Sequence, residues 1–282
     1  LITNFRMNKL SYLFLISVFI FTACKSSSLV KPGDSVEVAF QKGFAKYEEG
    51  NYGDAADIFE TVTRIGRGSE YAQEAQYYLA ESYFNMERYI IAESEYLRFI
   101  TFYPRDPKRE EVDFKKAISV YHQSPRYRLD QTATRRAIDE FQLFNSRYPN
   151  SEYVTQSAEK INELREKLSR KYFESAEFYS RTDQFKAATI YYDLVIDRYP
   201  ESKWAESALL NQIETYNDYA SNSILAKQVE RYELAISSYE KYIQLFPQSS
   251  ARGQAESMRD RAEQGINDAR KLLSESQNPQ SN

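Results

Sequence analysis

The chain carries a short pattern of small and aromatic positions that recurs along most of its length. In each copy, an aromatic residue follows an alanine at the fourth position, and a proline usually stands twelve residues after the alanine. Positions four apart share one face of a helix, so each pair predicts an amphipathic helix with a buried face. Proline lacks a backbone N–H and disfavours helix in the preceding residue, so it ends that helix. The copies are Ala92, Tyr96 and Pro104; Ala137, Phe141 and Pro149; Ala188, Tyr192 and Pro200; and Ala235, Tyr239 and Pro247.

A fifth, weaker copy and a preceding helix extend the pattern. Ala55 and Phe59 form the fifth copy, in which Gly66-Arg67-Gly68 replaces the proline. A small residue followed three positions later by tyrosine marks the preceding helix at Ala80 with Tyr83 and at Ala176 with Tyr179, and Gly43 holds the small position of the first copy. This pattern resembles the tetratricopeptide repeat, which implies an all-α fold: a right-handed α-solenoid of about five helical hairpins and a capping helix.

The copies are spaced more widely than the usual 34 residues, which predicts longer helices and loops within the array. Residues 151–181 contain neither Gly nor Pro and predict one long helix, whereas residues 122–130 predict a loop. The serines that follow three of the prolines are predicted N-caps: Ser151, Ser202 and Ser249. The predicted repeat domain covers residues 34–275, with hairpins over 34–67, 69–104, 107–149, 151–200 and 202–247 and a cap over 250–275.

The N-terminal residues predict an export signal. Residues 10–21 form an apolar run behind Arg6 and Lys9 that is too short to cross a bilayer, which takes about 20 residues. Small residues then precede Cys24, the only cysteine in the chain. This arrangement resembles a bacterial lipobox and implies that Cys24 carries a diacylglycerol and an N-acyl chain. We therefore expect a signal peptide over 1–23, a lipidated flexible tether over 24–33, and a disordered tail over 276–282.

The residue after Cys24 bears on which membrane the lipoprotein is attached to. Lys25 stands where an aspartate would imply retention at the inner membrane. The resemblance therefore implies attachment to the periplasmic face of the outer membrane. Lasting attachment of a protein to a membrane requires about two lipid chains or equivalent signals, and the lipidated cysteine would carry three acyl chains.

Composition narrows the function classes. Aromatic residues make up 15% of the chain, with only 8 Gly and 8 Pro, a composition typical of a folded helical protein. The net charge of −4 argues against a nucleic-acid partner. A single cysteine excludes a disulfide framework, and His122, the only histidine, excludes a His-pair metal site or a Ser–His triad. We expect no enzymatic activity and no cofactor beyond the lipid on Cys24.

The central part of the chain carries a more specific resemblance. The segments involved are Arg128-Leu129-Asp130 leading into Ala137–Phe141, Arg147–Tyr153, the helix with Tyr172, Ala176 and Tyr179, and Asp197–Ser202. Together with the lipobox and the repeats, they resemble the BamD family of outer-membrane lipoproteins. The resemblance implies a scaffold of the β-barrel assembly machinery that binds the periplasmic domains of the barrel-inserting subunit BamA. It also implies recognition of unfolded outer-membrane proteins through their C-terminal signals.

Two groups of side chains are candidate contact residues. Neighbouring aromatic residues cannot all face one helix seam, so some are expected to line a groove that reads substrate termini. This candidate groove comprises Tyr47, Tyr77, Tyr78, Tyr83 and Phe84. The second group is either a solvated face or a docking patch for an acidic partner surface, and comprises Arg126, Arg128, Arg135 and Arg136.

Two other classes of lipoprotein remain open. One is a periplasmic tetratricopeptide adaptor for cell-envelope or peptidoglycan coordination, which usually carries an N-terminal coiled coil. The other is a nutrient-binding outer-membrane lipoprotein, which brings several sugar-stacking tryptophans. Here no sustained heptad pattern precedes residue 34, and the one tryptophan, Trp204, has a position typical of a structural role.

Overall fold

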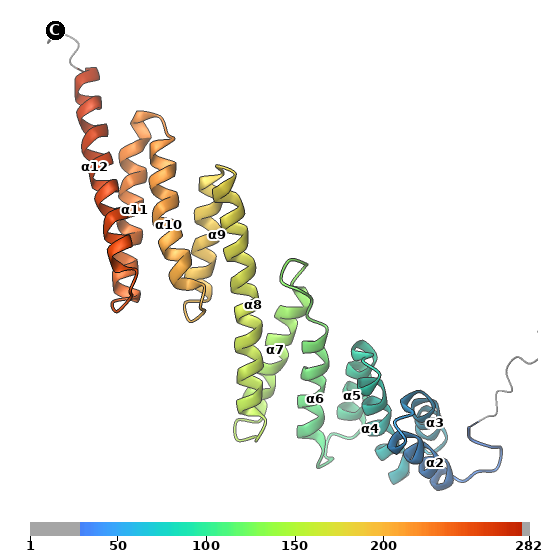
Figure 1. Ribbon diagram of the computed structural model, residues 1–282. Helices are drawn as coiled ribbons and strands as arrows, with labels where there is room; N and C mark the ends of the chain where they lie inside the picture. Colours follow the sequence, from blue (N-terminus) through green and yellow to red (C-terminus); the bar gives the residue numbers. More distant parts are fainter. Residues whose placement is uncertain (1–28, 278–282) are drawn as a thin grey trace, which may run out of the picture. The chain divides into compact units, whose positions relative to one another are not determined.

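The computed structural model describes residues 29–277, which divide into two compact units (Figure 1). The N-terminal unit, up to Met86, contains α2 (Val36–Glu48), α3 (Tyr52–Ile65) and α4 (Glu70–Asn85). The C-terminal unit, from Glu87 onward, contains α5 (Tyr89–Phe102), α6 (Arg109–His122), α7 (Thr132–Arg147), α8 (Val154–Arg181), α9 (Phe185–Arg198), α10 (Ala205–Ser221), α11 (Leu225–Leu245) and α12 (Arg252–Gln277).

Within each unit, every helix packs against the next one along the chain. Helices two steps apart also touch, as α2 and α4 do in the first unit and α10 and α12 in the second. The described residues contain no strand. The predicted all-α fold of helical hairpins is therefore confirmed.

The repeated alanines lie on the buried faces of these helices. All five are fully buried: Ala55, Ala92, Ala137, Ala188 and Ala235. The aromatic residue four positions after each alanine is at most 9% exposed. A methyl group lets the neighbouring helix approach, and the ring one turn later fills the space beside it. The spacing in the sequence thus identifies the buried face of each of these helices.

The repeat prolines end their helices as predicted. Each of α5, α7, α9 and α11 ends two residues before its proline. The residue in between is aromatic, and its φ lies between −123° and −138°, outside the helical region, as expected for a residue before proline. Its N–H still donates to the carbonyl four residues earlier, as Tyr103 does to Phe99 at 2.8 Å.

The predicted serine N-caps are wrong in position. Ser151, Ser202 and Ser249 each lie three residues before the helix that follows. The hydroxyls of Ser151 and Ser249 accept the backbone N–H two residues later, at 3.2 and 3.0 Å, so each closes a tight turn ahead of its helix. The chain needs this extra turn because the proline has first taken it out of the helical conformation.

The long predicted helix is present as α8, which has 28 residues and is about 42 Å long at 1.5 Å per residue. It packs against α7 on one side of the sequence and α9 on the other, so it belongs to two successive hairpins (Figure 1). The predicted loop between α6 and α7 is also present. Buried Gln131 holds it together by donating its side-chain amide to the carbonyls of Arg126 and Leu129, at 2.9 and 3.0 Å.

Candidate functional site

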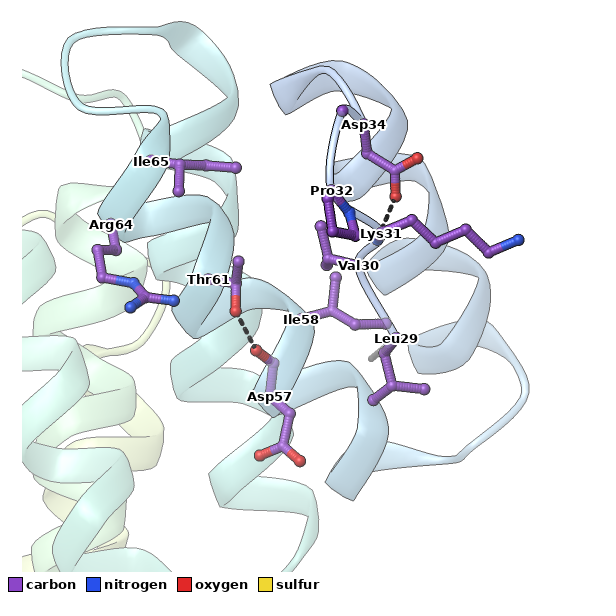
Figure 2. A pocket seen from close by; sticks show the side chains of 11 residues that line it. Leu29, Val30, Lys31, Pro32, Asp34, Asp57, Ile58, Thr61, Arg64 and Ile65 are labelled. Atoms are coloured by element: carbon purple, nitrogen blue, oxygen red, sulfur yellow. Dashed lines mark hydrogen bonds between the residues drawn. The ribbon is translucent and has the colours of Figure 1, made fainter. Parts of the chain in front are cut away.

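The lipid-attachment residue predicted from the sequence, Cys24, lies outside the described residues. The described part of the predicted flexible tether begins at Leu29 and is packed against the N-terminal unit. Figure 2 shows Leu29 and Val30 beside Ile58 of α3. They border a cavity of about 600 Å³ between this segment and α3. Burial of the apolar side chains at positions 29 and 30 lowers the free energy of the folded chain, so this part of the segment is held in place.

A turn closed by Asp34 orients the docked segment. The Asp34 carboxylate accepts the backbone N–H of Lys31 at 2.7 Å and forms an ion pair with Lys42 of α2 at 2.5 Å. The hydrogen bond from Lys42 is the main reason why the pKa of Asp34 lies below its ordinary value. The ionised carboxylate therefore fastens the tether to α2.

Protonation or removal of this carboxylate is expected to release the tether. Since the pKa of Asp34 is lowered in the folded state, its stabilising effect is complete above the unfolded value of 3.8 and is lost as the pH falls through the folded pKa. Hydrogen exchange should give the Lys31 amide a high protection factor at pH 6 and a lower one well below pH 3.8, and the Asp34→Asn variant should show the lower protection factor at both. Asp57→Asn, at the other aspartate of the cavity, is the control. Equal protection in the two variants would contradict this assignment.

The candidate aromatic residues lie on α2 and α4 of the N-terminal unit. Tyr78 is at the centre of a cluster of rings, with centroids 5.1 Å from Tyr47 and 5.3 Å from Tyr77. It also packs against Phe44 and Phe59 between the helices, at 5.2 and 5.6 Å. The structure thus brings three of the five candidates together, within the packing of α2, α3 and α4.

The other two candidates lie one turn further along α4. Tyr83 packs against the edge of the same apolar cluster, and Phe84 is half-buried beside it in the sequence. Tyr77 is 9% exposed, whereas Tyr47 and Tyr78 are half-buried. Part of each ring of these two tyrosines can therefore meet a ligand, and a role in reading substrate termini stays a prediction.

The four candidate arginines are separated by the structure. Arg136 on α7 forms an ion pair with Glu93 of α5, so it fixes one helix to another. Arg135 is exposed on the same helix. Arg126 and Arg128 lie in the α6–α7 loop, on either side of Tyr127. Each lines a different cavity, one of about 360 Å³ and one of about 330 Å³, and Tyr127 lines both.

Sequence reasoning missed the residues that complete these two cavities. They come from α8, from the middle of α9 and from the residue before α10, and include Arg170, Lys171, Phe178, Tyr191 and Trp204. The available signal was the spacing of the lining positions 163, 167, 170, 174 and 178 on α8, because residues three and four apart share one helix face.

Residues 29–277 contain neither a metal-binding cluster nor a membrane-spanning helix. No cluster of histidine, cysteine and carboxylate side chains there could hold a metal ion. None of the helices in that range has an apolar stretch long enough to span a bilayer.

Comparison with known proteins places this helical chain in a family. The model of the YfiO family, described as outer membrane lipoproteins, matches residues 32–231. The outer membrane protein assembly factor BamD of Caulobacter vibrioides is 28% identical over 192 residues, which cover 68% of this chain and 63% of that protein. The protein of the same name from Rickettsia prowazekii is 25% identical over 215 residues, covering 75% of this chain and 84% of that one. The family match runs through both units and through the lining of both Tyr127 cavities, and the chain therefore belongs to the YfiO family of outer-membrane lipoproteins.

Proposed function

We propose that this protein is an outer-membrane protein assembly factor that acts as a lipid-anchored scaffold. The observation that carries the proposal is the family match over residues 32–231, together with relatives named as assembly factors that match at 28% and 25% identity. Helical hairpins that expose side chains along successive helices suit the binding of other polypeptides. No chemical step is needed for such a role.

The proposal has a partner, a substrate and an anchor. The partner is the barrel-inserting subunit, of the BamA type, and the substrates are unfolded outer-membrane proteins. The half-buried Tyr47 and Tyr78 would contact the substrate. The loop arginines Arg126 and Arg128 would contact the partner. An acylated Cys24 would hold the scaffold at the periplasmic face of the outer membrane. Only four residues lie between Cys24 and the docked Leu29, so an extended chain would keep the N-terminal unit within about 17 Å of the bilayer surface.

Co-purification tests the scaffold role. Tagged protein is isolated from detergent-solubilised outer membranes, and the barrel-inserting subunit is expected in the eluate in stoichiometric amount. A tagged, unrelated outer-membrane lipoprotein serves as the control. Absence of that subunit, under conditions in which the bait is folded by circular dichroism, would refute the proposed partner.

The anchor is tested separately. The Cys24→Ala variant is expected to keep its helical circular dichroism spectrum and to move from the membrane fraction to the soluble periplasmic fraction, because it offers no thiol for acylation. Ser27→Ala, three residues further on, should stay with the membrane. Membrane retention of the Cys24→Ala variant would contradict the anchor.

A further inference from the structure

One face of α8 forms the floor of both cavities beside Tyr127. Glu166, Lys167 and Arg170 line the first cavity, and Lys171, Glu174 and Phe178 line the second. These positions recur at intervals of three and four, so they form a continuous strip along the helix. From Glu166 to Phe178 the strip is about 18 Å long, at 1.5 Å per residue. The two cavities share this strip and Tyr127, and together they are called here the Tyr127 groove.

Tyr127 divides this groove and is held from two sides. Its ring centroid lies 4.2 Å from the guanidinium carbon of Arg170, a stacked cation–π contact. Its hydroxyl accepts the Nε–H of Arg128 at 2.9 Å. The ring is thus fixed before any ligand arrives, which lowers the entropy cost of binding against it.

The Tyr127 groove is basic although the whole chain is acidic. Its lining includes seven basic side chains and three carboxylates, whereas the net charge of the chain is −4. The ammonium groups of Lys167 and Lys171 donate to neutral oxygens, the Ser124 hydroxyl at 2.8 Å and the Leu129 carbonyl at 2.6 Å. Glu163 lies near Lys167, Asp130 lies near Lys171, and Arg170 forms an ion pair with Glu174 at 3.2 Å. The groove is therefore basic because cations outnumber carboxylates in its lining. Burial lowers the pKa of Lys167, so a nearby anion would be favourable.

Both cavities of the groove carry aromatic surface. The second cavity is lined by Phe178, which is 53% exposed, and by half-buried Tyr191. In the first cavity the Trp204 ring lies 5.7 Å from the guanidinium carbon of Arg170. Such rings offer flat apolar faces to an aromatic side chain, while the cations between them suit carboxylates.

We propose that the Tyr127 groove binds an extended, acidic polypeptide segment that carries an aromatic residue. At about 3.3 Å per residue, the 18 Å strip matches five to six residues of extended chain, which is too long for a compact small molecule. Carboxylates of the segment pair with the α8 cations, and its aromatic ring packs against Trp204 or Phe178. The inference deepens the proposed scaffold function and rests on it for the expectation that the ligand is a polypeptide.

The fluorescence of Trp204 reports on the groove alone, because Trp204 is the only tryptophan of the chain. The full chain in detergent micelles is titrated with a capped heptapeptide of glutamate, phenylalanine and glycine, and with the counterpart in which lysine replaces glutamate. We expect the glutamate peptide to change the Trp204 emission saturably and the lysine peptide to leave it unchanged.

A matched pair of double variants tests the cations. Arg170→Gln/Lys171→Gln is expected to raise the Kd of the glutamate peptide about tenfold, which corresponds to a loss of about 1.4 kcal/mol. Arg270→Gln/Lys271→Gln, an equivalent adjacent pair on α12, is expected to leave the Kd unchanged. Circular dichroism establishes that both variants are folded. A fluorescein-labelled peptide gives the Kd by anisotropy, independently of any change around Trp204.

Three results would overturn the inference. They are equal Kd values in the two double variants, an equal emission change with the lysine peptide, and displacement of the peptide by phosphatidylglycerol added to the micelles, which would point to a lipid ligand instead. The outcome is separable from that of the scaffold role. If the barrel-inserting subunit co-purifies while the groove binds no acidic peptide, only the groove assignment fails. If the peptide binds while that subunit is absent, the groove stands and the proposed partner fails.

Discussion

Replacing Phe141 with alanine is expected to lower the free energy of unfolding by about 3–5 kcal/mol. The ring is fully buried in the contact of α6, α7 and α8, with centroids 6.1 Å from Phe114 and 6.4 Å from Tyr121. The side chains around it come from three helices whose spacing is already set by Ala137, so they cannot collapse into the space that the ring leaves. Urea unfolding followed by circular dichroism at 222 nm measures the loss.

The control lies on the same helix. Leu143 is 48% exposed, and Leu143→Ala is expected to change the free energy of unfolding by no more than about 0.5 kcal/mol. Trp204 fluorescence provides a second probe, on the neighbouring hairpin that shares α8. Similar losses for Phe141→Ala and Leu143→Ala would mean that the recurrent aromatic position is not a core position.

Gly265→Ala is expected to destabilise the fold by about 1–3 kcal/mol, although alanine is the better helix former. A Cβ at position 265 would lie 2.4 Å from Cζ and 2.5 Å from Cε2 of Tyr232. This tyrosine of α11 is 9% exposed, so its ring has little room to move away. The overlap can be relieved only by separating α11 and α12, which costs burial along both. Chemical denaturation measures the loss.

The second glycine of α12 gives the opposite expectation. A Cβ at Gly253 meets no atom within 4 Å, so Gly253→Ala should raise the free energy of unfolding by up to about 1 kcal/mol. A double-mutant cycle isolates the steric origin, since Gly265→Ala should cost much less in a Tyr232→Ala background. An unchanged cost in that background would show that Tyr232 is not the obstacle.

The sequence predicts the buried faces well where the pattern is local. A pair of residues four apart needs no distant information to share a helix face, and a proline acts on its own backbone. The helices that contain Ala92, Ala137, Ala188 and Ala235 could therefore be placed, with their ends. The serine N-caps failed because the turn that follows each proline depends on the direction in which the next helix must leave.

The candidate sites depended on contacts that spacing does not encode. Tyr47 and Tyr78 lie outside the recurrent pattern, and each helix of a stack has neighbours on two sides, so either face of it can be buried. The arginines show the same limit. Arg126 and Arg136 are ten residues apart in the sequence, yet one lines a cavity and the other pairs with Glu93, which lies on another helix of the unit.

By itself, the sequence determined an all-α chain of helical hairpins, the residues at the hairpin contacts and the C-terminal ends of the helices that precede a proline. These features follow from periodicity and from the backbone chemistry of proline. Only the tertiary structure decided that the tether docks at Leu29 and Val30, that Gly265 has to remain small beside Tyr232, and that Tyr127 lies over one face of α8. These features join residues tens of positions apart, and their geometry is set by how whole helices pack.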